Sequence, residues 1–287
     1  MKSLLYSLLF LPGLLLGQGF EVGVMVGASN YLGDLSSNSS SLYLNETGFA
    51  GGAFTRFNIN EFVGLRLGFA AGSISGTDAN ADFESIRERN LNFQTGILEG
   101  SLTAEFNIMG YQPYNLNRPF SPYIFGGISL INFNPKTDFE GQIVDLQPLG
   151  TEGQGMDGRE APYDLISLAI PFGLGVKYAI NDSWNVGLEL GARATFTDYL
   201  DDVSTTYVEF SELLAANGET AAALGNRQGE FLGTEPVSVP TGTPRGDDVS
   251  SDWFFILGVT VSYYFLDNGL VGSRGRSKRG KNGCNTN

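Results

Sequence analysis

The chain has 287 residues, a formal net charge of −14, 39 glycines and no histidine, and 42% of its residues are hydrophobic. An acidic chain is not expected to bind nucleic acid, whose phosphates attract basic surfaces, and this apolar content is too high for general disorder. Because histidine is absent, Ser-His and Cys-His nucleophilic pairs are excluded, and we expect neither enzymatic activity nor a cofactor.

The first 17 residues have the pattern of a signal peptide. A positive start at Lys2 precedes an apolar run from Leu4 to Leu16, and Gly17 offers a small residue before the polar Gln18. The run is shorter than the roughly 20 residues of a spanning helix, and no cysteine stands there to accept a lipid. We therefore expect residues 1–17 to be removed and the mature chain to begin at Gln18.

Beyond Gln18, apolar residues alternate with small or polar ones at the period of a strand. Strands of about 9 to 11 residues with this alternation are typical of outer-membrane barrels. Eight segments match, although the second is Gly-rich and the fifth and eighth are apolar on both faces near one end. The predicted strands are Phe20–Tyr31, Gly48–Phe57, Val63–Ala71, Leu98–Ile108, Tyr123–Phe133, Ile166–Tyr178, Trp184–Phe196 and Trp253–Phe265.

The connections between these segments are alternately long and short, as in outer-membrane barrels with short periplasmic turns and long outer loops. We therefore predict an all-β fold, a closed eight-stranded antiparallel transmembrane barrel over residues 18–265 with both ends of the chain in the periplasm. The largest outer loop contains Phe210–Leu224, rich in Leu, Ala and Glu, which predicts a short helix. The long loops are Leu32–Thr47, Ile74–Asn90, Asn134–Asp164 and Thr197–Asp252.

The small and polar face of the strands also carries charges. The interior of an eight-stranded barrel is only wide enough for side chains, so we expect these charges to pair and fill the lumen. A proton or ion path is the alternative, which charges of both signs in a narrow lumen disfavour. The predicted lumen charges are Arg56, Arg66, Glu99, Glu105, Lys177, Glu189 and Arg193, with Glu21 on the same face.

Two loop motifs have some features of ligand sites. Gly150–Gly155 lacks the Lys and Ser/Thr of a phosphate-binding loop and is interpreted as a Gly-rich turn. The pairs Asp201-Asp202 and Asp247-Asp248 could meet around a hard cation. Four acids do not complete the six to eight oxygens of a calcium site, and solvated loop acids are the simpler interpretation.

Residues 266–287 form a basic tail after the last strand. Its glycines disfavour a helix and its positive charges repel one another, so we expect a flexible periplasmic arm. It either attaches electrostatically to an acidic periplasmic partner or is simply solvated. The unpaired Cys284 could form an intermolecular disulfide. The basic residues are Arg274, Arg276, Lys278, Arg279 and Lys281.

Five segments together resemble the PorG family, small outer-membrane barrels of the Bacteroidota type IX secretion system. The resemblance implies a non-enzymatic component that contacts outer-membrane lipid and a periplasmic ring built from a lipoprotein and its ring partner. It also implies support of secretion and, in gliding species, of motility. The segments are Tyr31–Leu35, Arg89–Phe93, Pro122–Ile128, Leu149–Gly155 and Phe196–Ser204.

Two other interpretations remain open at this point. One is an outer-membrane recognition barrel that binds an external ligand or ion through its long loops. The other is a soluble lipocalin-like barrel, which would place its apolar face inside.

Overall fold

A computed structural model describes residues 19–36, 44–112 and 118–265 of the chain. The expected signal peptide, residues 1–17, and the expected basic tail, residues 266–287 with Cys284, lie outside the described residues.

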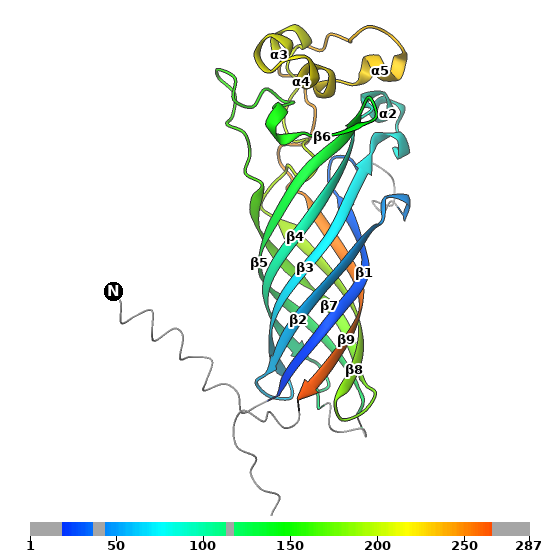
Figure 1. Cartoon of the computed structure of the whole chain (residues 1–287), viewed down its shortest axis with the longest axis vertical. Coiled ribbons are helices and arrows are strands. Elements are labelled where there is room, and N and C mark those ends of the chain that lie inside the picture. Colours follow the sequence, from blue (N-terminus) through cyan, green and yellow to red (C-terminus); the bar gives the residue numbers. More distant parts are fainter. Residues whose placement is uncertain (1–18, 37–43, 113–117, 266–287) are drawn as a thin grey trace, which may run out of the picture.

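Nine strands form one sheet in the described part of the chain, and eight of them close into a barrel (Figure 1). The order is β4-β3-β2-β1-β9-β8-β7-β5, all neighbours are antiparallel, and pairing of β4 with β5 closes the ring. The ninth strand, β6, pairs only with β5 and extends it as a hairpin. The predicted closed, eight-stranded antiparallel barrel is therefore confirmed. The strands are β1 Phe20–Leu32, β2 Gly48–Asn58, β3 Val63–Thr77, β4 Asn92–Asn107, β5 Phe120–Phe139, β6 Gln142–Asp145, β7 Ile166–Ala179, β8 Trp184–Thr195 and β9 Trp253–Phe265.

Three strands are longer than the alternation indicated. β3 continues beyond Ala71 to Thr77, β4 begins at Asn92 rather than Leu98, and β5 extends past Phe133. The backbone hydrogen bonds between neighbouring strands continue in these segments because they do not depend on which side chains face outward. The outward-facing side chains there are polar rather than apolar. The second and third outer loops are correspondingly shorter than predicted.

β1 begins and β9 ends at the same end of the barrel (Figure 1), where Phe20 pairs with Phe265. The short connections 59–62 and 180–183 lie at this end, as do residues 108–112 and 118–119 between β4 and β5. We call it the turn end, and we call the opposite end, which carries the long connections, the loop end.

Two of the short turns are closed by the same local chemistry. The side-chain oxygen of Asn60 accepts hydrogen bonds from the N–H groups two and three residues further on, both at 2.8 Å. The oxygen of Asn181 does the same at 2.9 and 2.8 Å. Asparagine favours such turns because its side chain satisfies the backbone locally, and each turn fixes the register of its hairpin.

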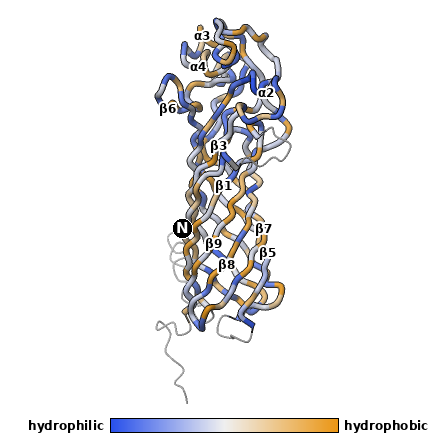
Figure 2. Tube along the Cα trace, turned by 90° about the vertical axis from the view of Figure 1, so that its right-hand side faces the viewer, coloured by the Kyte–Doolittle hydropathy of each residue, from blue (hydrophilic) through white to orange (hydrophobic). Residues whose placement is uncertain are grey.

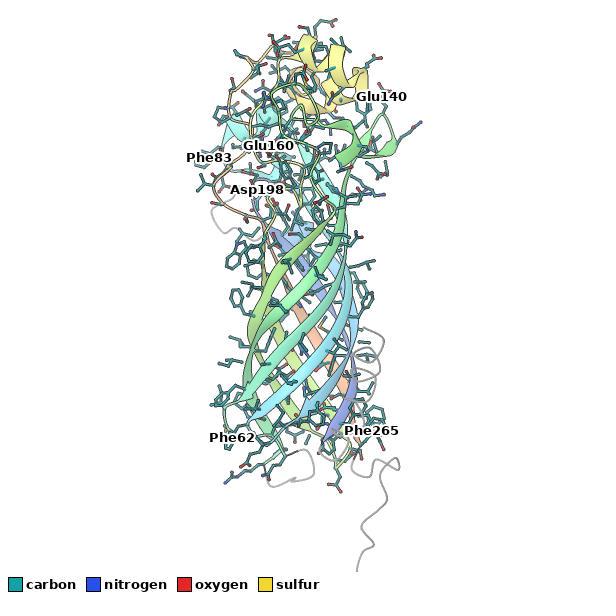
Figure 3. All side chains as sticks on the ribbon, turned by 90° about the vertical axis from the view of Figure 1, so that its left-hand side faces the viewer. Phe62, Phe83, Glu140, Glu160, Asp198 and Phe265 are labelled. Carbon is teal, nitrogen blue, oxygen red and sulfur yellow. The ribbon has the colours of Figure 1, made fainter. Side chains whose placement is uncertain are left out.

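The outer wall of the barrel is apolar, whereas charges lie inside. Side chains of the middle strand positions are 40% to 62% exposed on this wall, namely Leu65, Leu67, Phe172, Leu174, Leu188 and Leu190. Aromatic pairs border them: Trp184 and Tyr263 with ring centroids 5.1 Å apart at the turn end, and Phe172 and Trp253 at 5.7 Å nearer the loop end. Phe62 and Phe265 also lie at the turn end (Figure 3).

This polarity is the reverse of that of a water-soluble barrel, so the lipocalin-like alternative is wrong. An apolar outer band between aromatic girdles is typical of outer-membrane-type barrels. We conclude that the strands span a membrane and that the apolar wall faces lipid.

The long connections form a cap over the loop end, where hydrophilic residues are frequent (Figure 2). The predicted helix Phe210–Leu224 is two helices, because Gly218 between them has φ +91°. No helix in the described ranges has the length and apolar content to cross a bilayer. The helices of the cap are η2 Leu44–Glu46, η3 Asp78–Asn80, α2 Glu84–Arg89, η4 Gln147–Leu149, α3 Phe210–Asn217, α4 Glu219–Gly225 and α5 Gln228–Leu232.

Candidate functional site: the ion-paired lumen and the cap

All the predicted lumen charges lie inside the barrel. Each alternates along its strand with a lipid-facing neighbour, so the pleat of the strand directs it inward. The buried set is Glu21, Arg56, Arg66, Glu99, Glu105, Lys177, Glu189 and Arg193.

Glu105 of β4 is the centre of the main ion cluster, with 1% of its surface exposed. Its carboxylate lies 2.5 Å from Lys177 Nζ, 2.8 Å from Arg56 Nε and 3.4 Å from Arg66 Nη1. The contact with Lys177 is a hydrogen bond. Three cations from β7, β2 and β3 therefore converge on one anion.

Two further glutamates balance these cations. Glu21 accepts a hydrogen bond from Arg56 at 2.7 Å, and Glu189 accepts two from Arg66 at 2.5 and 2.9 Å. The hydroxyl of Tyr123 also donates to Glu189 at 2.6 Å. The cluster thus holds three cations and three anions, and it requires no bound counterion.

A second pair lies apart from this cluster, where Arg193 Nε contacts Glu99 at 3.2 Å. The cavity lined by Arg66, Arg193, Glu99 and Glu189 has a volume of about 30 Å³. Such a space holds no more than a few water molecules. The lumen therefore offers paired charges and a small void rather than the open path of an ion channel.

Aromatic rings fill the space around the cations. Arg66 lies 5.4 Å from the ring centroid of Phe54 and 5.0 Å from that of Phe125. Lys177 Nζ lies 4.3 Å from the centroid of Tyr123. Cations over ring faces are attracted by the ring quadrupole, so these rings stabilise the charges that they enclose.

Tyr111 closes the lumen from the turn end. It lies in the connection between β4 and β5 and is 5% exposed. Its hydroxyl donates to Glu21 at 3.3 Å, its ring lies 4.6 Å from Lys177 Nζ, and its N–H donates to the Glu61 carbonyl at 2.6 Å. A residue from a turn thereby becomes part of the lumen network.

The loop end of the lumen is closed by apolar side chains instead. Ile131 and Phe133 of β5 and Phe254 of β9 are at most 1% exposed. They belong to the same buried cluster as Leu200 and Val203 of the cap. The core of the cap is thus continuous with the interior of the barrel.

Tyr31, at the end of β1, joins two buried carboxylates of the cap. Its hydroxyl oxygen lies 2.7 Å from Asp201 Oδ2 and 2.7 Å from Asp252 Oδ1. The other oxygens of these carboxylates accept backbone N–H groups, from Val203 and Leu200 respectively, both at 2.9 Å. Burial raises the pKa of both Asp201 and Asp252 well above the ordinary value, and their neighbouring carboxylates raise it further.

Glu152 is the centre of a second cap network. Its carboxylate accepts hydrogen bonds from the N–H groups of Ser204 and Thr205, each at 3.0 Å, and from Arg245 at 3.0 Å. Arg245 also donates to the Asp202 carbonyl at 2.6 Å. The Gly-rich segment Gly150–Gly155 is therefore a structural turn that places a buried carboxylate.

Arg89 ties three connections together. Its Nε and Nη2 donate to Asp78 at 2.8 and 2.7 Å, Nη2 also donates to the Asp34 carbonyl at 3.0 Å, and Nη1 donates to the Arg245 carbonyl at 2.7 Å. Burial disfavours its charge, but the hydrogen bonds and the charge of Asp78 raise the pKa of Arg89 above the ordinary value.

The structure does not assemble the acidic pairs into a cation site. Asp202 accepts from the hydroxyls of Thr151 at 2.5 Å and Tyr163 at 2.6 Å, and Asp201 faces Tyr31. Asp247 lies elsewhere, with its N–H bonded to Asp34 at 3.1 Å. Among the described residues, no group of three or more Asp, Glu, His or Cys is arranged to hold a metal ion.

Four of the five segments that resemble the PorG family meet in this cap: Tyr31–Leu35, Arg89–Phe93, Leu149–Gly155 and Phe196–Ser204. The fifth contributes Tyr123 to the lumen. The sequence suggested Asp201 and Asp202 as candidate cation ligands, whereas the structure places them in a buried hydrogen-bond network with Tyr31, Thr151 and Tyr163.

Comparison with protein families gives one match, since the family described as "Domain of unknown function (DUF6089)" matches residues 2–221. The chain belongs to this family. The DUF6089 match extends over most of the chain, from the first residues through β8 and into the helices of the cap. Comparison with curated proteins yields no match.

Solved structures similar to this DUF6089 member are outer-membrane proteins. The chain is 12% identical to OprG of Pseudomonas aeruginosa, with a TM-score of 0.39 over 86% of this chain and 96% of that one. For Ail of Yersinia pestis in complex with a heparin analogue, the identity is 10%, the TM-score 0.39 and the coverage 86% and 99%. For outer membrane protein W of E. coli, the values are 14%, 0.31, 87% and 100%.

Proposed function

We propose that the chain is a non-enzymatic, non-conducting component of the outer membrane that anchors or assembles the periplasmic ring of a type IX secretion machinery. The filled lumen is the observation that supports a non-conducting anchor. Paired charges occupy the turn end and a buried apolar cluster closes the loop end. A barrel without a conduit is suited to holding a position in the membrane rather than to passing a solute.

The secretion role rests on the resemblance to the PorG family. Its segments supply Tyr123 to the lumen and Tyr31, Arg89, Glu152 and Asp201 to the cap. These residues hold the barrel and the cap in one shape, which an anchor requires.

The proposed orientation places the turn end in the periplasm and the cap outside the cell. Short periplasmic turns and long outer loops are the rule for such barrels. β1 begins and β9 ends at the turn end, where Phe20 pairs with Phe265, so the tail after Phe265 would start from the periplasmic side, within reach of a ring lipoprotein and its ring partner.

The test is affinity isolation of the full chain from its native envelope, followed by identification of co-purifying proteins at low and moderate salt. We expect a periplasmic ring lipoprotein and its partner. A variant in which Arg274, Arg276, Lys278, Arg279 and Lys281 are changed to Gln, and one truncated after Asp267, should recover less of both, because attraction between charges weakens without them.

Two outcomes separate the parts of the proposal. Unchanged recovery from both variants, with the barrel still folded, would move the contact from the tail to the periplasmic turns. If no ring protein co-purifies with the unaltered chain, the secretion role itself is contradicted.

A second function is favoured by the composition of the cap. The connections at the loop end carry most of the acidic residues of the chain, and the exposed Phe83, Phe231 and Val249 lie among them. A recognition barrel would use this surface to bind an external ligand. Deletion of the segment from α3 to α5 discriminates the two, since an anchor keeps its ring partners and a recognition protein loses its ligand.

A further inference from the structure

The two hydrogen bonds between Tyr31 and the carboxyl groups require one more proton than Tyr31 supplies. A tyrosine hydroxyl carries one proton and donates one hydrogen bond, whereas a carboxylate only accepts. The Tyr31 oxygen nevertheless lies 2.7 Å from an oxygen of Asp201 and 2.7 Å from an oxygen of Asp252. One of these contacts can be a bond donated by Tyr31, and the other requires a proton on the carboxyl group.

We propose that Asp201 and Asp252 share one proton through Tyr31, that this proton latches the fourth connection of the cap to the mouth of the barrel, and that its loss at alkaline pH releases the latch. The backbone fixes where the proton resides. Asp201 Oδ1 and Asp252 Oδ2 already accept N–H groups, so the proton lies on the oxygen of either carboxyl that faces Tyr31.

The three groups come from elements that the latch holds together. Tyr31 lies near the end of β1, Asp201 lies in the connection after β8, and Asp252 immediately precedes β9. Both carboxyl groups are at most 1% exposed. The latch lies beside the apolar seal of the lumen, because Asp252 accepts the N–H of Leu200, which belongs to the buried cluster with Phe254.

The surrounding charges favour retention of the proton. The carboxylates of Asp34 and Asp198 face the pair from the connections after β1 and β8 and make a second negative charge unfavourable. The cation directed toward Asp201 is Arg89, which is already bound by two oxygens of Asp78. Proton loss would therefore leave two adjacent buried anions.

The packing is close on the side of the pair that faces Gly33. A Cβ atom at Gly33 would lie 1.9 Å from Asp252 Oδ1 and 2.0 Å from the Tyr31 oxygen. Movement of the connection away from the mouth would relieve the repulsion between the two anions. Because the closed cap binds a proton that the open cap releases, the closed form is favoured at lower pH and the open form at higher pH.

Trp253 follows Asp252 directly, and its ring packs against Phe172 at the loop-end border of the outer wall, so movement of the connection that precedes it should change its exposure. The sequence contains two tryptophans, so Trp184→Phe at the turn end leaves Trp253 as the single probe. In this background, refolded in detergent, acrylamide quenching of Trp253 is measured from about pH 6 to about pH 10. We expect quenching to rise at alkaline pH, and we expect the rise to be lost in Asp201→Asn and in Asp252→Asn.

The asparagine variants keep the hydrogen bonds to Tyr31 but remove the group that loses its proton at alkaline pH. In Asp201→Asn, the amide donates to Tyr31 and Tyr31 donates to Asp252, so the network is complete at every pH in this range. The exposed Asp248 provides the control, since Asp248→Asn should keep the alkaline rise. A rise that is the same in the parent and in both latch variants would overturn the proposal.

Infrared spectroscopy tests the shared proton without reference to opening of the cap. At about pH 7, the difference spectrum between the parent and Asp201→Asn should contain a protonated carboxyl band, and that between the parent and Asp248→Asn should not. Absence of the band from the parent at this pH would contradict the proposal even if one variant failed to fold.

Discussion

Arg66 and Glu189 face each other across the full width of the barrel. Arg66 lies on β3 and Glu189 on β8, and three strands separate them in either direction around the ring. Their two hydrogen bonds, at 2.5 and 2.9 Å, connect opposite walls through the lumen. The pair therefore acts as a strut that sets the separation of the walls.

Removal of one end of this strut should destabilise the barrel. Glu189→Ala leaves Arg66 buried with the 3.4 Å contact to Glu105 as its remaining ion pair, and loss of one member of a buried pair typically costs about 3 to 5 kcal/mol. We expect a clear fall in the melting temperature, and a smaller fall when both residues are replaced by Met. Glu235→Ala, at an exposed glutamate of the cap, is the control. Equal melting temperatures of Glu189→Ala and the control would contradict a stabilising role of the Arg66–Glu189 pair.

The assignment of the apolar outer wall to lipid is tested by the same substitution, leucine to arginine, at two positions. Leu188 on β8 and Leu214 on α3 are similarly exposed, at 48% and 41%, but only Leu188 is placed against lipid. Arginine near the membrane midplane is unfavourable by about 2 to 4 kcal/mol. Leu188→Arg should therefore reduce folding into lipid vesicles by more than Leu214→Arg. Equal folding of the two variants would mean that the facing of β8 is wrong.

The cap should lose stability as the pH rises toward neutral. Burial raises the pKa of Asp198 to about 7 and that of Asp34 to about 6, whereas an aspartate in an unfolded chain has a pKa of about 3.9. A raised pKa contributes stability below the unfolded value, and this contribution is lost as the pH rises through the folded value.

Melting measured between about pH 5 and about pH 8 should show this fall in the parent and a shallower one in Asp198→Asn. Asp248→Asn, a change at an exposed acid of the cap, should follow the parent. A melting temperature that rises over this interval would contradict the sign of the prediction.

The Glu152 network should hold the cap without holding the barrel. Glu152→Gln keeps the shape of the side chain but leaves the buried Arg245 without its 3.0 Å partner charge, and uncompensated buried charges are strongly unfavourable. Hydrogen exchange should therefore accelerate in residues 196–252 and remain unchanged in the barrel strands. Glu160→Gln, at an exposed position of the same connection, should have no such effect, and equal exchange in both variants would contradict the role of Glu152.

The filled lumen predicts that the protein does not conduct. The full chain in planar bilayers should give no steady current in salt solution, because the charged cluster is neutral as a set and the loop end is closed by Phe133 and Phe254. Steady conductance that Glu105→Gln alters would instead support the ion-path interpretation.

The barrel could be predicted from the sequence because its signal is local. Alternation of apolar and polar residues shows which side chains face lipid, and that alone placed Arg66, Glu105 and Glu189 inside. Their partners could not be predicted, since the meeting of β3 with β8 across the lumen depends on closure of the whole ring. The uncertain facing of β5 and β9 has a physical cause, because their inward residues at the loop end are apolar where they join the core of the cap.

The buried carboxylates of the cap could not be predicted from the sequence, for a different reason. Acidic residues in loops are usually solvated, so Glu152, Asp201 and Asp252 gave no sign of being buried. Each is held by a residue far away in the chain, such as Tyr31 for the two aspartates. The segments that carry the family resemblance and the Asp201-Asp202 pair pointed to this region, but neither indicated that its carboxylates are buried.

Since Phe254 and Ile131 of the barrel share one buried cluster with Leu200 and Val203 of the cap, the two parts are not interchangeable modules. Removal of the cap would open one end of this lumen to water. Likewise, the four connections grafted onto another barrel would lack the apolar floor on which they pack. An engineer who wishes to display a foreign segment on this protein should insert it at the tip of the β5–β6 hairpin, where Glu140 and Gly141 turn outside that shared core.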